Sequence, residues 1–415
     1  MDRDVDVAVV GGGAAGLMAA VQAAQRGRRT VLIEKNRKPG LKILISGGGR
    51  CNLTTTRSGK DLELQYGKRR GRFLRHALRS FPPTALREFI EAAGVPLREE
   101  DLEKLFPISQ KAGDVVDALL ALVERSGVEL VRDAPVADVW RVDGDGGGER
   151  GFVLSTPSGE VRAQSVVLAT GGLSYPKTGA TGDGYAWCRA FGHTITSTYP
   201  ALAPLRVDAP WVRALQGIVL KDVDIACVGA DGKETLRRRR PILFTHKGLS
   251  GPAPMDLAGD IEELVGKAQV RFDFLPEVPE QDLEQRWLSA AKQNGSRRVE
   301  SVLPRQVPER VRHALVERAG SAADRTLASW PKDERRALLR AVKDLRVPSP
   351  NSLGYGAAEV TRGGVVLDEV DAKTMQSKLQ PGLFLCGELL DIDGPIGGFN
   401  FQAAFATGRL AGLFA

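Results

Sequence analysis

The feature that most constrains the fold is a glycine-rich turn between an apolar strand and an alanine-rich helix near the amino terminus. Val5–Val10 has the character of a buried parallel strand, and the helix that follows extends to about Arg26. Thr30–Glu34, which reads TVLIE, resembles a second buried strand. This order predicts a βαβ unit, so we expect an α/β fold with a parallel sheet.

The turn has the spacing GxGxxG at Gly11, Gly13 and Gly16. The spacing alone is a weak signal, but a strand before it and a helix after it are the context of a dinucleotide site. The first glycine then allows the turn, the second the approach of a diphosphate to the helix N-terminus, and the third helix–strand packing. Glu34 would accept hydrogen bonds from a ribose, which favours FAD or NAD over NADP. A Rossmann turn that binds no ligand is the alternative.

A second glycine-rich stretch, ISGGGRCNLT, occupies residues 45–54. It follows the second strand after a short loop, EKNRKPGLK, so it should lie against the same ligand. It lacks the Gly-Lys-Ser/Thr ending of a P-loop. Its glycines would let backbone N–H groups face a flat ring or a diphosphate, with Arg50 and Asn52 as polar contacts. The alternative is a glycine-rich surface loop.

A matching piece near the carboxyl end reads CGELLDIDGPIGGFNFQAAFATG, residues 386–408. A strand should end at Gly387 and Glu388, and a helix should begin near Gly398. The N-terminus of such a helix can stabilise negative charge on N1–C2=O of a reduced flavin. One diphosphate needs only one helix N-terminus, so two of them indicate a larger, electron-accepting ligand, namely FAD.

The rest of the chain divides by composition. Residues 193–274 show short strands with proline and glycine breaks, whereas 281–343 is polar, arginine-rich and helical in pattern. We expect a FAD-binding Rossmann-like domain from 1–192 and 358–415, a β-barrel-like substrate domain at 193–275 with a return strand at 344–357, and a helical insertion at 276–343. Within the first domain we expect helices at 73–80, 83–93 and 111–126, strands at 128–131, 136–142, 152–156 and 161–163, and a turn at Gly144–Gly148. We also expect a buried strand in SVVLATGG, residues 165–172, that ends in Thr-Gly-Gly.

Composition limits the class of protein. The 415 residues are 42% hydrophobic, which is enough for two or three packed cores. Four scattered cysteines and four histidines have no metal-ligand or CxxC spacing, so we expect no metal site, disulfide framework or dithiol chemistry. We find no signal peptide and no apolar run of membrane-spanning length, which predicts a cytoplasmic protein without a membrane partner.

The net charge of +7 is concentrated in two basic runs, KRRGRFLR at 68–75 and RRRR at 237–240. Such runs can indicate nucleic-acid binding. Aromatic residues make up only 6% of the chain, however, and no RNA- or DNA-binding motif accompanies the runs. We therefore interpret them as solvated surface, with some charge near an anionic cofactor, and expect no nucleic-acid partner.

Six stretches of the chain together resemble one bacterial flavoprotein family. They read GGGAAGLMAA, GLKILISGGGRCNLT, LFPISQKAGDVVDAL, ATGGLSYPKTGATGDGYAWCRAFGH, LFTHKGLSGPAPMDL and VTRGGVVLDEVDAKTMQSKLQPGLFLCGELLDIDGPIGGFNFQAAFATG. The family includes aminoacetone-oxidase-like enzymes and the reductase-like proteins named for bile-acid dehydroxylation (BaiN-like NAD(P)/FAD-dependent oxidoreductases). The resemblance covers nearly the full length and is weakest over about 276–343. It implies an FAD-binding Rossmann-like domain, a β-barrel and a small helical domain.

Carried over by position, the resemblance implies noncovalent FAD held by both ends of the chain. It places the diphosphate and adenosine on Gly11, Gly13, Ala14, Ala15, Gly16, Glu34, Lys35 and Val136. The flavin side would be lined by Lys42, Ser46, Gly47, Gly48, Gly49, Arg50, Cys51, Asn52 and Thr54. The nucleotide would be covered by Thr170, Gly171 and Gly172, the ribityl chain would meet Gly387 and Glu388, and the isoalloxazine would meet Gly397, Gly398, Phe399 and Asn400.

Two positions depart from the family pattern. The family usually has an asparagine where Thr55 stands, and an arginine where Lys104 stands. The first departure puts one polar contact near FAD in question, and the second concerns packing.

His246, in FTHKGLSGP, is the candidate for proton transfer. Imidazole titrates near neutrality, and the resemblance places this loop in the β domain facing the flavin. A structural histidine is the alternative. Cys51 has no partner cysteine nearby in the sequence, so we interpret it as a small packing residue rather than a redox thiol.

These inferences predict an FAD-dependent oxidoreductase with a small-molecule substrate, and nothing in the sequence indicates its oligomeric state. The flavin would be reduced by a nicotinamide cofactor or a small substrate and reoxidised by an organic acceptor or dioxygen. The chain has no second GxGxxG unit, so NADH or NADPH would be a transient donor. One alternative is an amine oxidase that acts on an aminoacetone-like substrate with dioxygen. Another is a nucleic-acid-binding or redox-sensing flavoprotein.

Overall fold

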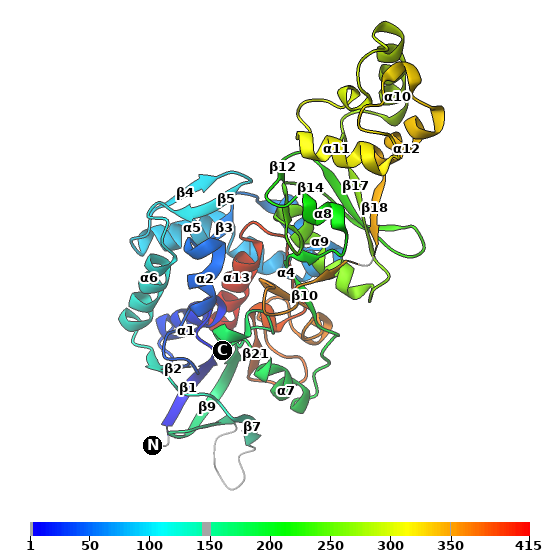
Figure 1. Cartoon of the computed structure of the whole chain (residues 1–415). Coiled ribbons are helices and arrows are strands. Elements are labelled where there is room, and N and C mark those ends of the chain that lie inside the picture. Colours follow the sequence, from blue (N-terminus) through cyan, green and yellow to red (C-terminus); the bar gives the residue numbers. More distant parts are fainter. Residues whose placement is uncertain (1–2, 143–150, 349) are drawn as a thin grey trace. The chain divides into compact units, whose positions relative to one another are not determined.

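The computed structural model of the chain describes residues 3–142, 151–348 and 350–415 (Figure 1). Its contacts divide it into two compact units. Unit 1 is Met1–Tyr199 with Glu359–Ala415, and unit 2 is Pro200–Ala358. Unit 1 therefore contains both ends of the chain. The turn predicted at Gly144–Gly148 lies outside the described residues.

The main sheet of unit 1 has the strand order β6–β2–β1–β9–β8–β7, and β21 also pairs with β9. The strands β6, β2, β1, β9 and β21 pair in parallel, whereas β8 and β7 form an antiparallel extension. The predicted α/β class and its Rossmann-type opening are confirmed. The bounds are Arg3–Val10 (β1), Thr30–Ile33 (β2), Glu129–Val131 (β6), Asp138–Val142 (β7), Gly151–Thr156 (β8), Gly159–Leu168 (β9) and Leu383–Leu385 (β21).

Strand β9 corrects one prediction, because it joins two segments that the sequence indicated as separate strands at 161–163 and 165–172, and it ends at Leu168. It pairs with β1 on both sides of Gln164, at 161–163 and at 165–168. On its other side it changes partner: its first half pairs with β8 and its last residues, from Val166, pair with β21. An unbroken neighbour on one side is enough to keep the strand continuous.

Helices α1, α6 and α7 contact strands of this sheet, and a small sheet, β3–β5–β4, is separate from it. The helices of unit 1 are Ala14–Gln25 (α1), Leu41–Gly49 (α2), Gly59–Gln65 (α3), Gly67–Ser80 (α4), Pro83–Ala92 (α5), Ala112–Arg125 (α6), Asp183–Ala190 (α7) and Phe399–Phe414 (α13), with strands Thr54–Thr55 (β3), Leu97–Glu100 (β4), Lys104–Pro107 (β5) and Val360–Arg362 (β20). Helix α4 begins before the predicted Phe73 because its basic residues occupy the exposed face of an amphipathic helix.

Helices α1 and α13, from the two ends of the chain, lie side by side (Figure 1). Glycines on α13 allow this close approach. An added Cβ at Gly408 or Gly412 would lie 2.2 Å from the carbonyl oxygen of Ala15 or Ala19, respectively. The two backbones therefore touch, and the contact fixes the N-terminus of α13 relative to that of α1.

The glycine-rich stretch 45–49 forms the end of helix α2. The helix has regular geometry from Leu41 and then kinks, with non-helical backbone at Ser46, Gly47 and Gly48. All three glycines, 47–49, have positive φ. The glycines thus end a helix, a role that their loop-like composition concealed.

Unit 2 has two antiparallel sheets around its own apolar core, with strand orders β12–β15–β16–β11–β19 and β14–β13–β17–β18. The strands are Leu205–Arg206 (β11), Val219–Leu220 (β12), Asp224–Val228 (β13), Glu234–Arg239 (β14), Ile242–Thr245 (β15), Gly248–Ser250 (β16), Gln269–Asp273 (β17), Leu345–Pro348 (β18) and Asn351–Ser352 (β19). The helices are Pro210–Ala214 (α8), Pro252–Glu263 (α9), Glu280–Gln293 (α10), Glu309–Arg318 (α11) and Lys332–Lys343 (α12).

Helix α9 was not anticipated within the region expected to be mainly β. It begins where Gly251, with φ +90°, turns the chain and Pro252 occupies the first helical position. Among the helices in the described part of the chain, none has both the length and the apolar character needed to span a bilayer.

Candidate FAD site

The predicted cofactor-binding segments follow the carboxyl ends of neighbouring parallel strands. The glycine turn follows β1, Glu34 follows β2, Thr170 comes soon after β9, and Gly387 comes soon after β21. Because these strands are neighbours in the order β2–β1–β9, with β21 beside β9, the segments meet at one edge of the sheet. Open α/β sheets bind their ligands at this edge.

The glycine turn packs tightly on one side and is open on the other. At Gly11, with φ +103°, an added Cβ would lie 2.6 Å from the Ala169 oxygen, and at Gly16 it would lie 1.8 Å from the Gly11 oxygen. At Gly13, in contrast, an added Cβ would have no atom of the described chain within 4 Å. The space beside Gly13, at the start of α1 with Ala14 and Ala15, therefore fits a diphosphate.

Glu34 is only 7% exposed and holds the turn in place. Its Oε2 accepts a hydrogen bond from Gly12 N–H at 2.7 Å, and its Oε1 accepts two from Asn36, at 2.8 Å from the backbone and 2.7 Å from the side chain. A carboxylate offers about four acceptor positions, so one remains for a ribose hydroxyl. The ribose contact stays a prediction, and a structural role for Glu34 is added to it.

A polar cluster joins three of the predicted segments. Lys42 Nζ lies 2.9 Å from Glu388 Oε2 and 2.7 Å from Ser174 Oγ. Ser174 Oγ and Thr361 N–H both donate to Glu388 Oε1, at 2.6 and 3.0 Å. An added Cβ at Gly172 would lie 2.9 Å from the same oxygen, so the glycine leaves room for the carboxylate. A partly buried ion pair thus lies where the resemblance predicts the ribityl side of FAD.

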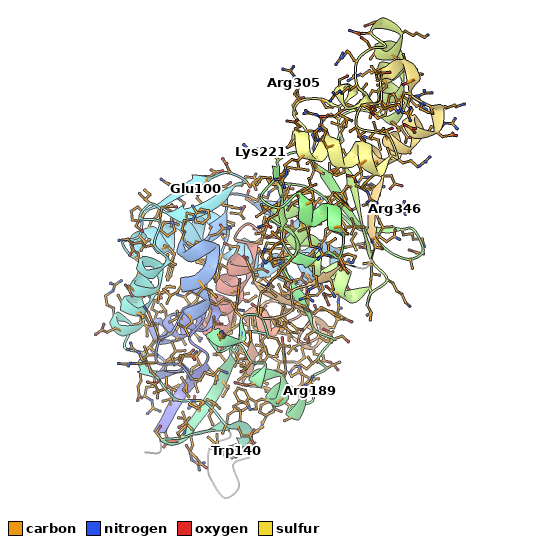
Figure 2. All side chains as sticks on the ribbon, in the orientation of Figure 1. Glu100, Trp140, Arg189, Lys221, Arg305 and Arg346 are labelled. Carbon is orange, nitrogen blue, oxygen red and sulfur yellow. The ribbon has the colours of Figure 1, made fainter. Side chains whose placement is uncertain are left out.

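In the stretch ISGGGRCNLT, Arg50 is already engaged within the protein. Its guanidinium donates to Glu100 Oε2 at 3.0 Å and to Gln110 Oε1 at 2.8 Å, and it lies over the Phe106 ring at 4.3 Å from the centroid. Glu100 is labelled in Figure 2. The observed role of Arg50 is to attach the end of α2 to β4 and β5, and its contact with FAD stays a prediction.

Cys51 is fully buried, in agreement with a packing role. Burial raises the pKa of its thiol to about 12, so the thiol stays protonated at neutral pH. A protonated thiol is a poor nucleophile and a poor redox group.

Asn52 and Thr54 connect the same stretch to the start of α13. With its amide oriented so that both atoms are satisfied, Asn52 accepts a hydrogen bond from Gly398 N–H at 3.0 Å and donates to Thr54 O at 3.2 Å. Thr54 Oγ1 donates to Gln402 Oε1 at 2.7 Å. An added Cβ at Gly398 would lie 2.5 Å from the Thr54 carbonyl, so this approach requires a glycine.

The side chains at the start of α13 are also used internally. Phe399 is buried and its carbonyl accepts a hydrogen bond from Tyr66 Oη at 2.7 Å. The Asn400 amide forms two hydrogen bonds with the backbone of Gly394, at 2.9 and 3.0 Å. Any contact of this segment, Gly397 included, with an isoalloxazine would therefore come mainly from backbone N–H groups at the helix N-terminus.

Two predicted contacts at the adenosine end and one at the cover of the nucleotide stay predictions, and the structure gives their present surroundings. Lys35 Nζ is paired with Asp183 at 2.7 Å, so its charge is matched by α7. Val136 precedes β7 instead of lying in a strand, and its backbone forms no hydrogen bond within the described residues. The hydroxyl of Thr170 is buried and has no hydrogen-bond partner within the described residues.

Several residues that hold the site together were missed by sequence reasoning. Arg70 pairs with Asp391 at 2.8 Å and with Asp393 at 3.0 Å, and Arg362 pairs with Asp393 at 3.2 Å. These ion pairs fix the DIDG loop that leads into α13. The sequence shows the two acids of the DIDG loop and, far from them, the basic run at 68–75. Neither feature by itself indicates that the two form ion pairs.

The two residues that depart from the family pattern, Thr55 and Lys104, lie opposite each other on neighbouring strands. Thr55 on β3 is the register partner of Lys104 on β5. Thr55 is 1% exposed, and its hydroxyl accepts a hydrogen bond from Arg57 N–H at 3.2 Å, so the shorter side chain is satisfied locally.

His246 lies in unit 2, at the exposed turn between β15 and β16, whereas the predicted FAD ligands lie in unit 1. The turn is fixed by Thr245 Oγ1, which accepts hydrogen bonds from the N–H groups of Lys247 and Gly248 at 3.3 and 3.1 Å. The role of His246 in proton transfer stays a prediction.

The fold and this edge of the sheet define a class of protein: an FAD-dependent oxidoreductase with a Rossmann-type FAD-binding domain. The chain belongs to the family described as HI0933-like protein Rossmann domain, whose model matches residues 5–414. The predicted family and the enzyme class are thereby confirmed.

Curated relatives match almost end to end. The chain is 33% identical to the ribosomal RNA dihydrouridine synthase of Escherichia coli K12 over 402 residues, which cover 97% of this chain and 96% of the relative. It is 30% identical to the protein of the same name from Haemophilus influenzae Rd, with 98% and 97% covered. It is 29% identical to the 3-dehydro-bile acid delta(4,6)-reductase of Clostridium scindens, with 98% of each chain covered.

Solved structures share the fold at low identity. A 3-ketosteroid delta1-dehydrogenase from Sterolibacterium denitrificans has a TM-score of 0.50 and 16% identity, with 98% of this chain and 99% of that chain covered. The FrdA chain of Escherichia coli quinol fumarate reductase has a TM-score of 0.50 and 17% identity, with 100% and 70% covered.

Proposed function

We propose that this protein reduces a carbon–carbon double bond conjugated to a carbonyl group, and that its substrate is a uridine base in ribosomal RNA. The observation that carries the proposal is the match to two relatives named ribosomal RNA dihydrouridine synthase, over nearly the full length of each chain. Dihydrouridine is uridine with its C5=C6 bond reduced, and that bond is conjugated to the C4 carbonyl. NADH or NADPH would supply the electrons, and the net reaction consumes one nicotinamide hydride and one proton per base.

Bound FAD would supply the two-electron chemistry, and the chain would bind and orient it. The open space beside Gly13 and the start of α1 would hold the diphosphate. The Lys42–Glu388 pair and the N-terminus of α13 would supply fixed charge and N–H donors on the flavin side.

The charge of α4 supports an RNA substrate. The helix carries basic residues at 68, 69, 70, 72, 75 and 79 and no acidic residue. Glu63 pairs with Arg75 and Arg79 at 2.9 and 3.0 Å, but Lys68 and Arg72 are exposed and form no ion pair within the described residues. An exposed cationic helix face is suited to RNA phosphates.

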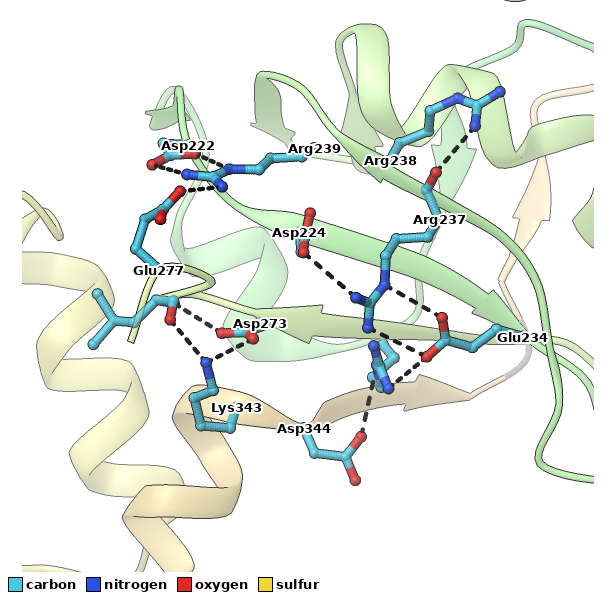
Figure 3. Close-up of polar contacts among 12 residues, drawn as sticks. Asp222, Asp224, Glu234, Arg237, Arg238, Arg239, Asp273, Glu277, Lys343 and Asp344 are labelled. Atoms are coloured by element: carbon cyan, nitrogen blue, oxygen red, sulfur yellow. Dashed lines mark hydrogen bonds and ion pairs between the residues drawn. The ribbon is translucent and has the colours of Figure 1, made fainter. Parts of the chain in front are cut away.

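The second basic run, at 237–240, is a weaker candidate for RNA binding because each of its guanidinium groups is paired with a carboxylate, and Figure 3 shows this for Arg237 and Arg239. Arg239 pairs with Asp222 and Glu277, and Arg237 pairs with Glu234 and Asp224. The remaining two, Arg238 and Arg240, pair with the buried Asp256 at 3.1 and 3.2 Å. The charge of this run is therefore mainly used in ion pairs within unit 2.

A second candidate substrate is a small molecule, which the bile-acid reductase relative favours. Its name describes the reduction of double bonds in a 3-dehydro compound, where the carbonyl also activates the alkene. The reaction type is thus shared, and the two candidates differ in the size and charge of the substrate. The amine-oxidase alternative has no such support.

The test uses the flavin as its own reporter. The purified FAD-loaded protein is mixed anaerobically with NADH, NADPH or aminoacetone, and bleaching of the flavin identifies the donor. The reduced protein is then mixed with unmodified ribosomal RNA or with a 3-oxo-Δ4 steroid. We expect a nicotinamide to bleach the flavin, RNA to restore the colour, and mass spectrometry to find two added hydrogens on a uridine. Bleaching by aminoacetone alone, or reoxidation by the steroid alone, would contradict the RNA proposal.

A double variant tests the cationic face. Lys68→Ala with Arg72→Ala should weaken binding of ribosomal RNA and reduce its salt dependence, because each lost phosphate contact lowers the slope by about one. Lys332→Ala with Arg336→Ala removes the same charge from exposed positions on α12 and serves as the control. Equal effects of the two double variants would mean that only net charge matters.

A further inference from the structure

Unit 2 contains a large cavity that the proposed reaction does not use. Its volume is about 820 Å³, and it lies between the β12–β13 connection and the 274–278 segment on one side and α10 with residues 301–307 on the other. Most of its walls are apolar and include Leu220, Val223, Phe274, Leu283, Trp287 and Val307. Cavities of this size typically hold an organic molecule.

One wall of the cavity is fixed by a lysine (Figure 3). Lys343 Nζ, on α12, donates to the carbonyl oxygens of Leu275 and Val278, both at 2.8 Å. The same ammonium pairs with Asp273 Oδ2 at 2.7 Å. These three contacts attach the 275–278 turn to the helical segment, so the cavity is framed by specific polar contacts as well as by apolar packing.

The acidic residues that line the cavity are already paired within the protein, whereas the basic ones are not. The two acidic lining residues, Asp222 and Glu277, are both paired with Arg239 (Figure 3). The two basic lining residues, Lys221 (labelled in Figure 2) and Arg286, are exposed and form no ion pair within the described residues. The charge left for a ligand is therefore positive.

We propose that this cavity binds a small amphipathic anion, with an apolar body against the walls and a carboxylate or sulfonate held by Lys221 and Arg286. The apolar walls supply affinity by burying the body of the ligand, and the free cations select for its charged end. The site is distinct from the FAD-binding edge because every lining residue belongs to unit 2.

The test compares two fluorescent probes with the same aromatic body. 8-Anilinonaphthalene-1-sulfonate carries a sulfonate, and N-phenyl-1-naphthylamine does not. With the FAD-loaded protein, we expect saturable binding of one sulfonate probe per chain and weaker binding of the neutral probe. Lys221→Ala with Arg286→Ala should weaken sulfonate binding about tenfold or more and leave neutral-probe binding unchanged.

Two further variants locate the site. Ala290→Trp places an indole in the cavity and should abolish binding of both probes. Ser289→Trp, at the preceding position on α10 and outside the lining of this cavity, should not. Arg336→Ala controls for the loss of an exposed cation. Melting temperature and flavin content are measured for each variant. Equal binding of the two probes by wild type, no effect of the Lys221/Arg286 double variant, or full binding by Ala290→Trp would each overturn the proposal.

Discussion

The ammonium of Lys42 lies 2.9 Å from a carboxylate oxygen of Glu388, although 346 residues separate them in the chain. Lys42 belongs to the helix after β2, and Glu388 follows β21 at the other end of unit 1. Their side chains are 24% and 16% exposed, so the pair is partly shielded from solvent. This contact ties together the two parts of the chain that the predicted cofactor would touch.

Removing one partner of this pair should weaken FAD binding. Glu388→Gln keeps the shape but leaves the Lys42 charge without its partner, and we expect an increase in the FAD dissociation constant that corresponds to about 1.5–3 kcal/mol for a charge-assisted contact. Equilibrium titration of apoprotein with FAD measures the effect. Lys60→Met, at an exposed lysine on α3, is the control and should leave FAD affinity unchanged.

Gly13 and Gly16 should respond differently to substitution. Gly13→Val should abolish FAD binding and leave the melting temperature of the apoprotein unchanged, because the new side chain would fill space that no atom of the described chain occupies. Gly16→Ala should destabilise the apoprotein, because its Cβ would lie 1.8 Å from the Gly11 oxygen. Heat denaturation and flavin content distinguish the two. A Gly13→Val protein with a full complement of flavin would place the diphosphate elsewhere.

The contact between α1 and α13 predicts opposite effects at two helical glycines. Gly408→Ala should destabilise the protein by about 1–3 kcal/mol, because the added methyl group is forced against the Ala15 carbonyl. At Gly113 in α6, an added Cβ would have no atom of the described residues within 4 Å. Gly113→Ala should therefore leave the free energy of unfolding unchanged or raise it by up to about 1 kcal/mol. Chemical denaturation measures both, and a neutral Gly408→Ala would show that the helices can separate without cost.

The buried cysteines predict a loss of stability at high pH. Burial raises the pKa of Cys51, Cys188 and Cys386 from 9.0 to about 12, so their contribution is fully present below pH 9 and is lost as the pH rises toward 12. A thiol-reactive dye at pH 8 should label these cysteines only after the protein is unfolded in guanidinium chloride. Rapid labelling of Cys51 in the native protein would contradict this prediction and would support a redox role for Cys51.

His246 gives the riskiest prediction. Because it lies at an exposed turn, His246→Ala should keep the fold and the bound FAD. If it transfers a proton, turnover per bound flavin should fall about 10²–10⁴-fold, and His246→Asn should be nearly as slow. Lys247→Ala, at the neighbouring position of the same turn, is the control. Normal turnover and pH dependence in both His246 variants would end the case for this residue.

The sequence alone was informative where the cause is local. The strand, glycine turn and helix at 5–26 could be predicted because apolar periodicity and the need for positive φ at Gly11 act within a few residues. It was less informative about α2 and α9, whose glycines and prolines resemble loop residues but instead end or begin helices. The two strands predicted around Gln164 merge because β1, distant in the chain, pairs with both.

The tertiary structure decided which polar groups meet. The sequence pattern predicted Arg50 as a polar contact of the cofactor and Arg237–Arg240 as solvated surface. The structure adds an ion pair of Arg50 with Glu100 and a carboxylate partner for each arginine of the run. Charge pairing depends on distance in space, and the partners of Lys42, Arg70 and Arg50 lie tens to hundreds of residues away. The conformational requirements of single glycines can therefore be predicted from the sequence. The ion pairs that hold the candidate site together form only after β2, β9 and β21 have assembled into one sheet edge.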